Sequence, residues 1–493
     1  MMPGSGNFLS TLHEAAAERL GSVFLREPNG DEITYGVMFD RAARLARVLH
    51  DHGVAPGDRV VVQVAKSPDA VALYLACLHA GAVQVPLNPA FTAEELEYFI
   101  GDADPALVVL DSTATGRVEI GELVSAADRA EPLALVDRSG DDLATLLYTS
   151  GTTGQPKGAS LSHANLWHNA HALHEVWRFG PSDHLLHTLP LFHVHGLFVA
   201  LHCAMLSAIP VTFLRKFDAD QVIAALPTAT VLMGVPTHYN RLLDDPRFDR
   251  ELTADVRLFT CGSAPLRDAV FEQFTARTGH HICERYGMSE AGIMTSNPYD
   301  GDRIAGTVGF ALRDVEIRIC DDTGNELPAG QTGIVEVRGP HLFRGYWQRP
   351  QATAAATRDD GWFVSGDVGS VDLEGRVTLQ GRSGDMIISG GENIYPKEIE
   401  IVLDDVDGVV ESAVIGVPHP DFGEAVVAVL VVETGPGSTG FADQGVDDAL
   451  AERLARFKHP KRRLVVDALP RNAMGKVQKS ALRDRYASLF ATS

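Results

Sequence analysis

The hydrophobic positions in the first hundred residues alternate between two periodic patterns. Helical spacing predicts three helices, at Arg41 to Gly53, Ala70 to Ala80 and Ala93 to Asp102. Short apolar runs typical of buried strands follow them, at Arg59 to Val64, Val83 to Pro86 and Ala106 to Leu110. Strands and helices that alternate at this spacing favour a largely parallel sheet covered on both faces, so the pattern predicts an α/β fold.

The pattern changes in the last two hundred residues. Between Asp300 and Gln380, strand-like alternation interrupted by glycine-containing turns predicts a small β subdomain. The helix and strand rhythm then resumes with expected elements at Glu398 to Val402, Glu411 to Val417, Ala425 to Val432, Val446 to Phe457 and Arg463 to Val466, and a surface loop at Gly435 to Gly440. We therefore expect a large N-terminal domain of parallel-rich sheets, residues 1–382, and a small α+β C-terminal domain, residues 383–493.

Composition and charge narrow the classes of function. The chain has 493 residues and a formal net charge of −23, which argues against sequence-independent binding of nucleic acid. Its five cysteines are widely spaced and form no Cys-x-x-Cys pair, which indicates buried thiols in a reducing compartment. The longest apolar stretch, Ala70 to Leu87, is interrupted by polar residues, glycine and proline, and the N-terminus has no signal pattern. We expect a cytoplasmic protein without a membrane partner.

One segment carries the strongest chemical signal, the run from Tyr148 to Gly158 directly after the apolar stretch Ala144 to Leu147. Three glycines allow successive N–H groups to face an anion, the hydroxyl side chains add donors, and Lys157 adds a cation. This combination is typical of a site that grips a polyphosphate, although the Gly-Lys-Ser/Thr ending of a Walker loop is absent. The alternative interpretation is a flexible Gly/Ser/Thr linker.

The same segment closely resembles the phosphate loop of the acyl-adenylate-forming superfamily, which includes acyl-CoA synthetases, luciferases and the adenylation domains of peptide synthetases. Further segments that resemble this superfamily follow in its order, and together they span nearly the whole chain. They are Pro190-Leu191-Phe192-His193, Gly262-Ser263-Ala264-Pro265, Glu284-Arg285-Tyr286-Gly287-Met288-Ser289-Glu290, Trp362-Phe363-Val364-Ser365-Gly366-Asp367, Gly381-Arg382, Gly390-Gly391-Glu392-Asn393-Ile394-Tyr395-Pro396 and Pro470-Arg471-Asn472-Ala473-Met474-Gly475-Lys476.

The resemblance implies roles for individual residues. The ATP-binding set is Thr149, Ser150, Gly151, Thr152, Thr153, Gly154, Lys157, Ser263, Ala264, Pro265, Glu284, Tyr286, Gly287, Met288, Ser289, Asp367, Arg382 and Lys476. Asp367 suits the ribose hydroxyls, and Glu290 with a neighbouring hydroxyl, Thr149 or Ser289, suits Mg²⁺. Ser289 stands where the family usually has threonine. The implied catalytic residues are Lys476, His193, which guards the acyl channel, and Glu290, whereas Gly391 is implied in CoA binding.

The acid to be activated is indicated by an arginine, Arg285, just before Tyr286 and Gly287. A guanidinium buried in an acyl pocket is costly without a partner, and a substrate with a second carboxylate would compensate it. The competing interpretation is that Arg285 points outward and pairs with Glu284. Longer runs at Leu191 to Phe198, Val231 to Thr237 and Thr295 to Arg303 resemble the malonyl-CoA synthetase family, which implies malonate binding by Arg285, with Arg241, His195 and Ser263.

The activity implied by this resemblance is an acid–thiol ligation in two steps. Malonate and Mg²⁺-ATP give malonyl-AMP and diphosphate, and CoA then gives malonyl-CoA and AMP. Between the steps, the C-terminal domain swings about a hinge at Arg382 to Asp385 and carries Lys476 away. The basic residues near the C-terminus (Arg456, Lys458, Lys461, Arg462 and Arg463) fit either CoA phosphates or a solvated face.

Several alternatives stay open from the sequence. A synthetase for methylmalonate, succinate or a short fatty acid would share the same motifs. An amino-acid-activating domain, a luciferase-type oxidase and a nucleotide-binding regulator without catalysis are the more distant alternatives. The expected partners are small molecules only, with no nucleic acid, in a monomer or a homodimer.

Overall fold

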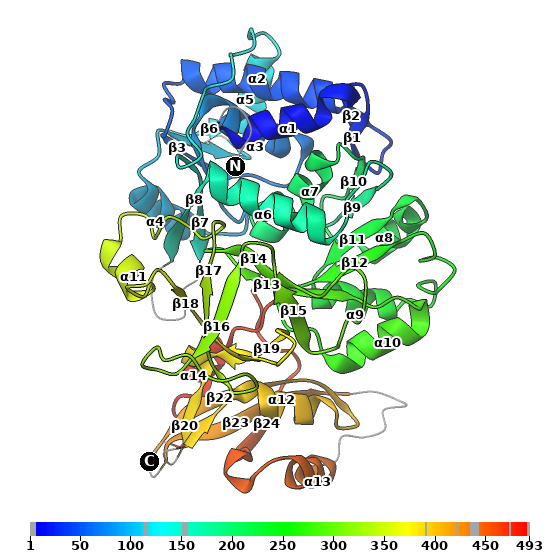
Figure 1. The fold of residues 1–493 in the computed structure, drawn as a ribbon, viewed down its shortest axis with the longest axis vertical. Coiled ribbons are helices and arrows are strands. Elements are labelled where there is room, and N and C mark those ends of the chain that lie inside the picture. The colour runs from blue at the N-terminus through cyan, green and yellow to red at the C-terminus, as the bar shows by residue number, and fades with distance from the viewer. Residues whose placement is uncertain are drawn as a thin grey trace.

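The computed structural model describes residues 6–112, 114, 116–149, 156–389, 392–420, 422–433, 443–472 and 475–490. Its strands form three sheets of six, thirteen and five strands, and helices pack against them (Figure 1). The first two sheets use residues up to Arg382, and the third uses residues after it. The predicted α/β class is confirmed.

The six-stranded sheet has the order β6-β5-β3-β4-β7-β8 and is parallel except for the antiparallel hairpin β7–β8. The segment resembling a phosphate loop joins these two strands, so it leaves the sheet at the end of a buried strand as predicted. The bounds are β3 Arg59–Gln63, β4 Val83–Pro86, β5 Leu107–Leu110, β6 Val118–Glu119, β7 Leu143–Thr149 and β8 Lys157–Ser162, with α2 Tyr35–Asp51, α3 Pro68–Ala80, α4 Ala93–Ala103 and α5 Ile120–Ala127.

Helices α3 and α4 follow their predicted bounds closely, α2 begins earlier than predicted, and α5 has no predicted counterpart. Helix α3 is buried around its whole circumference, which explains its nearly uniform apolar sequence, and it runs from the Ser67 cap to Gly81 in a left-handed conformation. Helix α2 begins six residues before the predicted Arg41, because the side chain of Thr34 accepts the backbone N–H of Val37 and caps an earlier turn.

The thirteen-stranded sheet has the order β16-β17-β18-β19-β15-β14-β13-β12-β11-β9-β10-β1-β2. Its parallel part runs from β13 to β1, whereas β13 to β19 are paired antiparallel and include the predicted small β subdomain. The strands are β1 Val23–Arg26, β2 Glu32–Thr34, β9 Leu185–His187, β10 Val211–Phe213, β11 Val231–Gly234, β12 Leu258–Cys261, β13 Cys283–Met288, β14 Gly292–Ser296, β15 Thr307–Ala311, β16 Glu316–Cys320, β17 Gly333–Arg338, β18 Phe363–Val371 and β19 Val377–Arg382.

Helices of the same part of the chain cover this sheet and separate it from the six-stranded one. Helix α6 crosses the middle of the molecule, and α8 to α10 lie on one side of the parallel strands (Figure 1). The bounds are α1 Phe8–Ala16, η1 Ala17–Arg19, α6 His163–Val176, the π-helix η2 His195–Ala200, α7 Leu201–Leu206, α8 Ala219–Ala225, η3 Leu226–Thr228, α9 Pro236–Leu243, α10 Asp268–Thr278 and α11 Pro350–Ala355.

The five-stranded sheet lies at one end of the molecule, together with α12 and α13 (Figure 1). Alternate side chains of β23 enter two separate cores: Val426 packs with α12 and α13, and Val427 packs on the other face with α14. The bounds are η4 Ser383–Asp385, β20 Ile387–Ser389, β21 Glu392–Ile394, α12 Pro396–Asp404, β22 Val409–His419, β23 Gly423–Val432, α13 Asp443–Arg453, η5 Arg456–Lys458, β24 Arg462–Val465 and α14 Lys479–Tyr486.

The domain boundary and the hinge near Arg382 stay predictions. The boundary predicted after Arg382 falls between β19 and η4. The surface loop predicted at Gly435 to Gly440 lies outside the described residues.

The five cysteines are all buried and free, which agrees with their interpretation as small core side chains. Among the described helices, none combines the length and the apolar character that crossing a bilayer requires.

Candidate active site

Arg285 on β13 is turned into the protein. Only 4% of the residue is exposed, and its guanidinium lies against the backbone of Gly262, where a Cβ would fall 2.5 Å from the Arg285 Cζ. Within the described part of the chain, Nε and Nη2 have no hydrogen-bond partner, and no ion pair is found to Arg285. The arginine is therefore a buried cation that faces a region without a fixed counter-charge.

Two histidines and a strained serine lie beside this arginine. His195, the first residue of the π-helix η2, is 1% exposed, and its Nδ1 lies 3.4 Å from the Oγ of Ser263. Its backbone N–H donates to Nδ1 of His193 at 3.2 Å. Ser263 has a φ of +68°, a conformation that costs a non-glycine residue energy and often marks a functional site.

The charges of this cluster are set by burial. Burial lowers the pKa of His193 to about 4, and the neighbouring charge of Arg285 adds to that effect. Burial first, and Arg285 second, holds the pKa of His195 well below its usual range. Burial also lowers the pKa of Arg285, but only to about 10. At neutral pH the cluster therefore combines two neutral imidazoles with one guanidinium, and its net charge is positive.

Glu284 precedes Arg285 in the same strand and points the other way, because successive side chains of a strand lie on opposite faces. It is 6% exposed, and its pKa is raised to about 8 by burial and then by the charge of Asp268. Lys397, from the C-terminal part of the chain, and a hydrogen bond from the backbone of Gly306 oppose this rise. The competing interpretation, an Arg285–Glu284 ion pair, is not what the structure contains.

A second group of site residues is held by cross-strand pairing. Asp367 on β18 and Arg382 on β19 are directly paired, and the Arg382 Nε lies 2.7 Å from Oδ1 of Asp367. The hydroxyl of Tyr286 on β13 donates to the other oxygen of this carboxylate. Burial raises the pKa of Asp367, and the charge of Arg382 opposes the rise. The carboxylate that is predicted to hold the ribose is therefore fixed from two sides.

Glu290 follows strand β13 and lies beside Tyr346. It is 7% exposed, and its Oε1 accepts a hydrogen bond of 2.9 Å from the hydroxyl of Tyr346. The ammonium of Lys157 stacks over the ring of the same tyrosine at 5.0 Å. Burial raises the pKa of Glu290, and the hydrogen bond from Tyr346 and the charge of Arg382 oppose the rise. A cation bound beside Glu290 would favour its ionised form.

Lys476 reaches this site from the C-terminal part of the chain. The residue is exposed overall, but the protein displaces solvent from its ammonium group and lowers its pKa, and Arg382 adds to this effect while Asp367 opposes it. Its loop is closed by the backbone N–H of Lys476, which donates to Oδ1 of Asn472, and Gly475 lies against Thr237 of α9. The lysine loop therefore lies across the site.

A cavity of about 640 Å³ lies at the carboxyl ends of β3, β4, β9 and β10. Two cations, Arg215 and Lys216, line it together with Leu191 and Phe192 of the predicted acyl gate. Lys66 also lines it, and burial holds the pKa of its amine well below the usual range of a lysine. Such crevices at the carboxyl ends of parallel strands are where open α/β sheets commonly bind ligands. This cavity is large enough for part of an extended anionic molecule.

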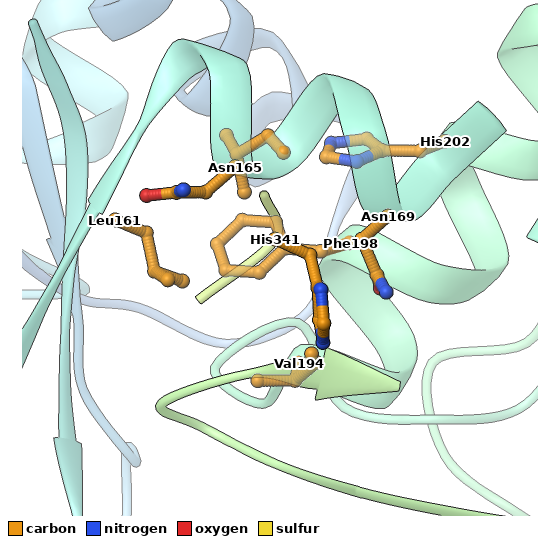
Figure 2. A pocket seen from close by; sticks show the side chains of 9 residues that line it. Leu161, Asn165, Asn169, Val194, Phe198, His202 and His341 are labelled. Carbon is orange, nitrogen blue, oxygen red and sulfur yellow. The ribbon is translucent and has the colours of Figure 1, made fainter. Parts of the chain in front are cut away.

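A second cavity behind the π-helix η2 is far smaller, about 10 Å³, which is the lower limit for a single water molecule. Figure 2 shows its lining, with Asn165 and His202 on opposite sides and the ring of Phe198 between them. It has no room for a substrate, and we assign it no role in the reaction.

Some predicted residues are not brought to this site. Arg241 is exposed in the last turn of α9. Burial lowers the pKa of His238, and the charge of Arg241 lowers it further. The role of Arg241 in malonate binding stays a prediction. Pro265 is also exposed. Most of the predicted phosphate loop and the predicted CoA-binding glycine lie outside the described residues: Ser150, Gly151, Thr152, Thr153, Gly154 and Gly391.

Two contributors to the site do not stand out in the sequence. Gly262 is visible only as part of a motif, and nothing in the sequence indicates that Arg285 needs the space of its missing side chain. Tyr346 belongs to no recognised motif, and the only signal is its place in a segment rich in aromatic and charged residues, Gly345-Tyr346-Trp347 before Arg349 and Pro350.

Comparison with known proteins decides the family. Residues 12–347 match the AMP-binding enzyme family, and residues 398–476 match the AMP-binding enzyme C-terminal domain. The chain belongs to the AMP-binding enzyme family. The first matched region contains Arg285, and the second ends at Lys476. Between the two regions lie Asp367 and Arg382.

This AMP-binding enzyme is similar over nearly its whole length to solved and curated proteins. The structure of ATP-bound MatB from Rhodopseudomonas palustris has a TM-score of 0.95 and 46% identity, covering 99% of this chain and 100% of that one. A feruloyl-CoA synthase from Amycolatopsis sp is 36% identical, covering 93% of this chain and 94% of its own. A mitochondrial malonate–CoA ligase from Mus musculus is 34% identical, covering 97% and 92%. The chain is accordingly an acid–thiol ligase, an acyl-CoA ligase.

Proposed function

We propose that this enzyme is an ATP-dependent malonate–CoA ligase that forms malonyl-CoA, AMP and diphosphate through a malonyl-AMP intermediate. The observation that carries the proposal is the burial of Arg285 without a carboxylate partner among the described residues. A second carboxylate on the substrate would supply the missing counter-charge through the planar fork of the guanidinium. A monocarboxylic acid would leave the guanidinium buried and unpaired.

The neighbours of Arg285 support a short substrate. His193 and His195 lie beside the guanidinium as neutral imidazoles, so they can donate or accept hydrogen bonds without adding a second fixed charge. Ser263 adds a hydroxyl next to His195. A three-carbon diacid places both of its charges within a few ångström of each other, which suits a cluster this compact.

In the first half-reaction, a carboxylate oxygen of malonate attacks the α-phosphorus of ATP, and the bond to the β-phosphate breaks as diphosphate leaves. Asp367, held by Arg382 and Tyr286, suits the hydroxyls of the ribose. Lys476 would supply positive charge where the carboxylate and the α-phosphate combine, and such preorganised charge typically contributes a factor of about 10²–10³ in rate.

Mg²⁺ fits the donor set near the phosphate loop. Glu290 would hold the ion, with the hydroxyl of Thr149 as a second ligand, because Mg²⁺ prefers hard oxygen donors of this kind. Mg²⁺ usually binds one or two carboxylates together with phosphate oxygens, and it neutralises the charge of the nucleotide phosphates. Tyr346 orients the carboxylate by donating to its Oε1.

In the second half-reaction, the thiol sulfur of CoA attacks the acyl carbon, and the bond to AMP breaks. The cavity lined by Arg215 and Lys216 supports a route for an anionic co-substrate toward Phe192. Movement of the C-terminal domain about Arg382 to Asp385 would withdraw Lys476 and bring Gly391 to the thiol path.

A ligase for another acid is the second candidate, and the similarity to a feruloyl-CoA synthase favours it. The two candidates differ in whether Arg285 is neutralised by the substrate. An aromatic acid with one carboxylate would need a long apolar pocket in place of the polar cluster around Arg285.

The experiment is a panel of acids, each incubated with enzyme, ATP, Mg²⁺ and CoA, with the CoA thioester identified by mass. Malonate is expected to give the highest kcat/KM, followed by methylmalonate, with acetate, butyrate and ferulate far below. A preference for a monocarboxylic acid would contradict the proposal and favour the second candidate. Absence of diphosphate release with every acid would support a nucleotide-binding protein without catalysis.

A further inference from the structure

Asn169 on α6 holds one residue of β14 by both of its backbone groups. Its Nδ2 donates to the carbonyl oxygen of Ile293 at 2.7 Å, and its Oδ1 accepts the backbone N–H of Ile293 at 3.2 Å. The amide thus bonds Ile293 as a neighbouring strand would, since β15 pairs with β14 further along, at Thr295 and Ser296. A side chain from a helix therefore completes the hydrogen bonding at the beginning of β14.

The strands at this contact approach closely because of two glycines. Gly292, the first residue of β14, has a φ of +57°, and a Cβ there would lie 2.5 Å from Oδ1 of Asn169. Gly287 of β13 is paired with Ile293, and a Cβ at 287 would lie 2.2 Å from the carbonyl oxygen of Gly292. The absence of both side chains allows α6, β14 and β13 to lie this close together.

Glu290 lies in the turn that follows β13 and precedes this contact. The turn comprises residues 289–291, and the backbone N–H of Ala291 donates to the carbonyl oxygen of Met288 at 3.2 Å across it. The carbonyl oxygen of Glu290 accepts the backbone N–H of Phe343 at 2.8 Å, and its carboxylate accepts the hydroxyl of Tyr346. The residue that we assign to Mg²⁺ is therefore held by its backbone as well as by its side chain.

Two segments that are far apart in the sequence hold this turn in place. Residues 343–346 contact Glu290 itself, whereas Asn169 holds the strand directly after the turn. Mg²⁺ demands a nearly octahedral geometry with oxygen ligands at about 2.0–2.1 Å, so a small shift of the turn would weaken metal binding. The ribose side of the site is held by the pairing of Asp367 with Arg382, so the same shift would affect it less.

We propose that Asn169 is a positioning residue that holds the β13–β14 turn so that the carboxylate of Glu290 can bind Mg²⁺ together with the nucleotide phosphates. Its amide acts through the backbone of Ile293 and not on the ion itself. Residues that orient metal ligands typically contribute a factor of about 10–100 to metal affinity. This inference rests on the Mg²⁺ role proposed above for Glu290.

The metal preference of nucleotide binding is the discriminating readout. It is the dissociation constant of ATP in EDTA divided by that of ATP with Mg²⁺, both measured by titration calorimetry on the full chain. A misplaced Glu290 lowers this ratio, because the carboxylate contributes to binding through the metal ion. The dissociation constant of AMP in EDTA does not involve the ion, so it reports general damage to the nucleotide site.

The variants separate the hydrogen bonds of Asn169 from its volume. Asn169→Leu keeps a branched side chain without the amide, and we expect it to lower the metal preference about tenfold and to leave AMP binding within about twofold of the wild type. Asn169→Ala should lower the metal preference only about threefold, because Asn169 lines the small cavity in Figure 2 and its truncation makes room for a water molecule that replaces part of the hydrogen bonding. Glu290→Gln gives the reference value for a site without the carboxylate charge.

Asn7→Ala is the matched control. Asn7 is fully buried, and its Nδ2 donates to the carbonyl oxygens of Leu78 at 2.8 Å and Val136 at 2.9 Å, so this variant also removes an amide that joins separate backbone segments. None of these three residues is among those that we assign to the nucleotide. We expect the thermal midpoint to fall in this variant as in the Asn169 variants, with the metal preference of the wild type retained.

Each outcome decides the question. A metal preference that falls in the Asn169 variants and not in Asn7→Ala supports the positioning role. An unchanged metal preference in Asn169→Leu, or equal weakening of ATP and AMP binding, overturns it, and Asn169→Ala decides by the same criteria if Asn169→Leu fails to fold. Wild-type protein without a metal preference would overturn the role of Glu290 and this inference with it. A normal metal preference without activation of malonate would contradict the proposed function alone.

Discussion

The guanidinium of Arg285 packs directly on Gly262, and the space it occupies is the space that any side chain at 262 would need. A Cβ there would lie 2.5 Å from Cζ and 2.6 Å from Nη1 of the arginine. The missing side chain at 262 is thus what allows the guanidinium to lie inside the protein. The position of the charge that we assign to substrate recognition depends on a residue with no functional group.

Gly262→Ala is therefore expected to displace the guanidinium and to lower kcat/KM for malonate about 100-fold, since a displacement of about 1 Å can cost that much. The KM for ATP should change little if the nucleotide side of the site keeps its shape. Steady-state kinetics with each substrate varied in turn measure both effects. Gly21→Ala is the control, because a Cβ at 21 meets no atom within 4 Å. Equal kinetics of the two variants would contradict the close packing.

Lys476→Ala is expected to separate the two half-reactions. Formation of malonyl-AMP should fall about 10²–10³-fold, because the ammonium no longer stabilises charge where carboxylate and phosphate combine. Conversion of synthetic malonyl-AMP and CoA to malonyl-CoA should stay close to the wild-type rate. Single-turnover measurements of each step test this. Equal losses in both steps would show that Lys476 does more than assist adenylation.

Glu284 is expected to make stability depend on pH. Its pKa is raised by burial to about 8 in the folded protein, whereas the unfolded chain has an ordinary carboxyl near 4.5. Between these values unfolding releases a proton, so the stability contributed by the protonated group is complete below the lower pKa and falls as pH rises toward 8, by at most about 1.4 kcal/mol per pH unit.

The comparison is between wild type and Glu284→Gln, which keeps a neutral, similarly shaped side chain. The variant should match the wild type near pH 4.5 and be more stable than it at pH 8. Urea unfolding at several pH values measures the difference. Parallel stability curves for the two proteins would show that Glu284 ionises as freely in the folded state as in the unfolded one.

The periodic parts of the fold were predictable because local patterns determine them. Helix α3 and strand β4 follow their predicted bounds closely, since uniform burial leaves a clear apolar signature in the sequence. The union of β15 to β19 with the parallel strands in one sheet was not predictable, because hydrogen bonding between distant strands leaves no periodic signal. The start of α2 differs from the prediction for another reason, because the local cap at Thr34 begins the helix before the apolar spacing does.

In the candidate site, too, some residues were predictable from the sequence and others were not. Asp367 and Arg382 were predictable as a pair, because their motifs both carry charged residues that family resemblance assigns to one nucleotide. That Arg285 faces inward does not follow from the residue pattern, which also allows an outward guanidinium paired with Glu284. The hydrogen bonds to the carboxylate of Asp102 were not predictable, because its partners Tyr148 and Arg349 are 46 and 247 residues away in the sequence.

The most direct test of the central claim is the ratio of kcat/KM for malonate to kcat/KM for butyrate in Arg285→Met. We predict that malonate turnover falls at least about 100-fold, as expected when one partner of a buried charge pair is removed, while butyrate turnover rises, so that the ratio collapses. Arg313→Met is the control, because Arg313 pairs with Glu175 at the surface and is 69% exposed. An unchanged ratio in Arg285→Met would contradict the assignment of Arg285 to a second substrate carboxylate.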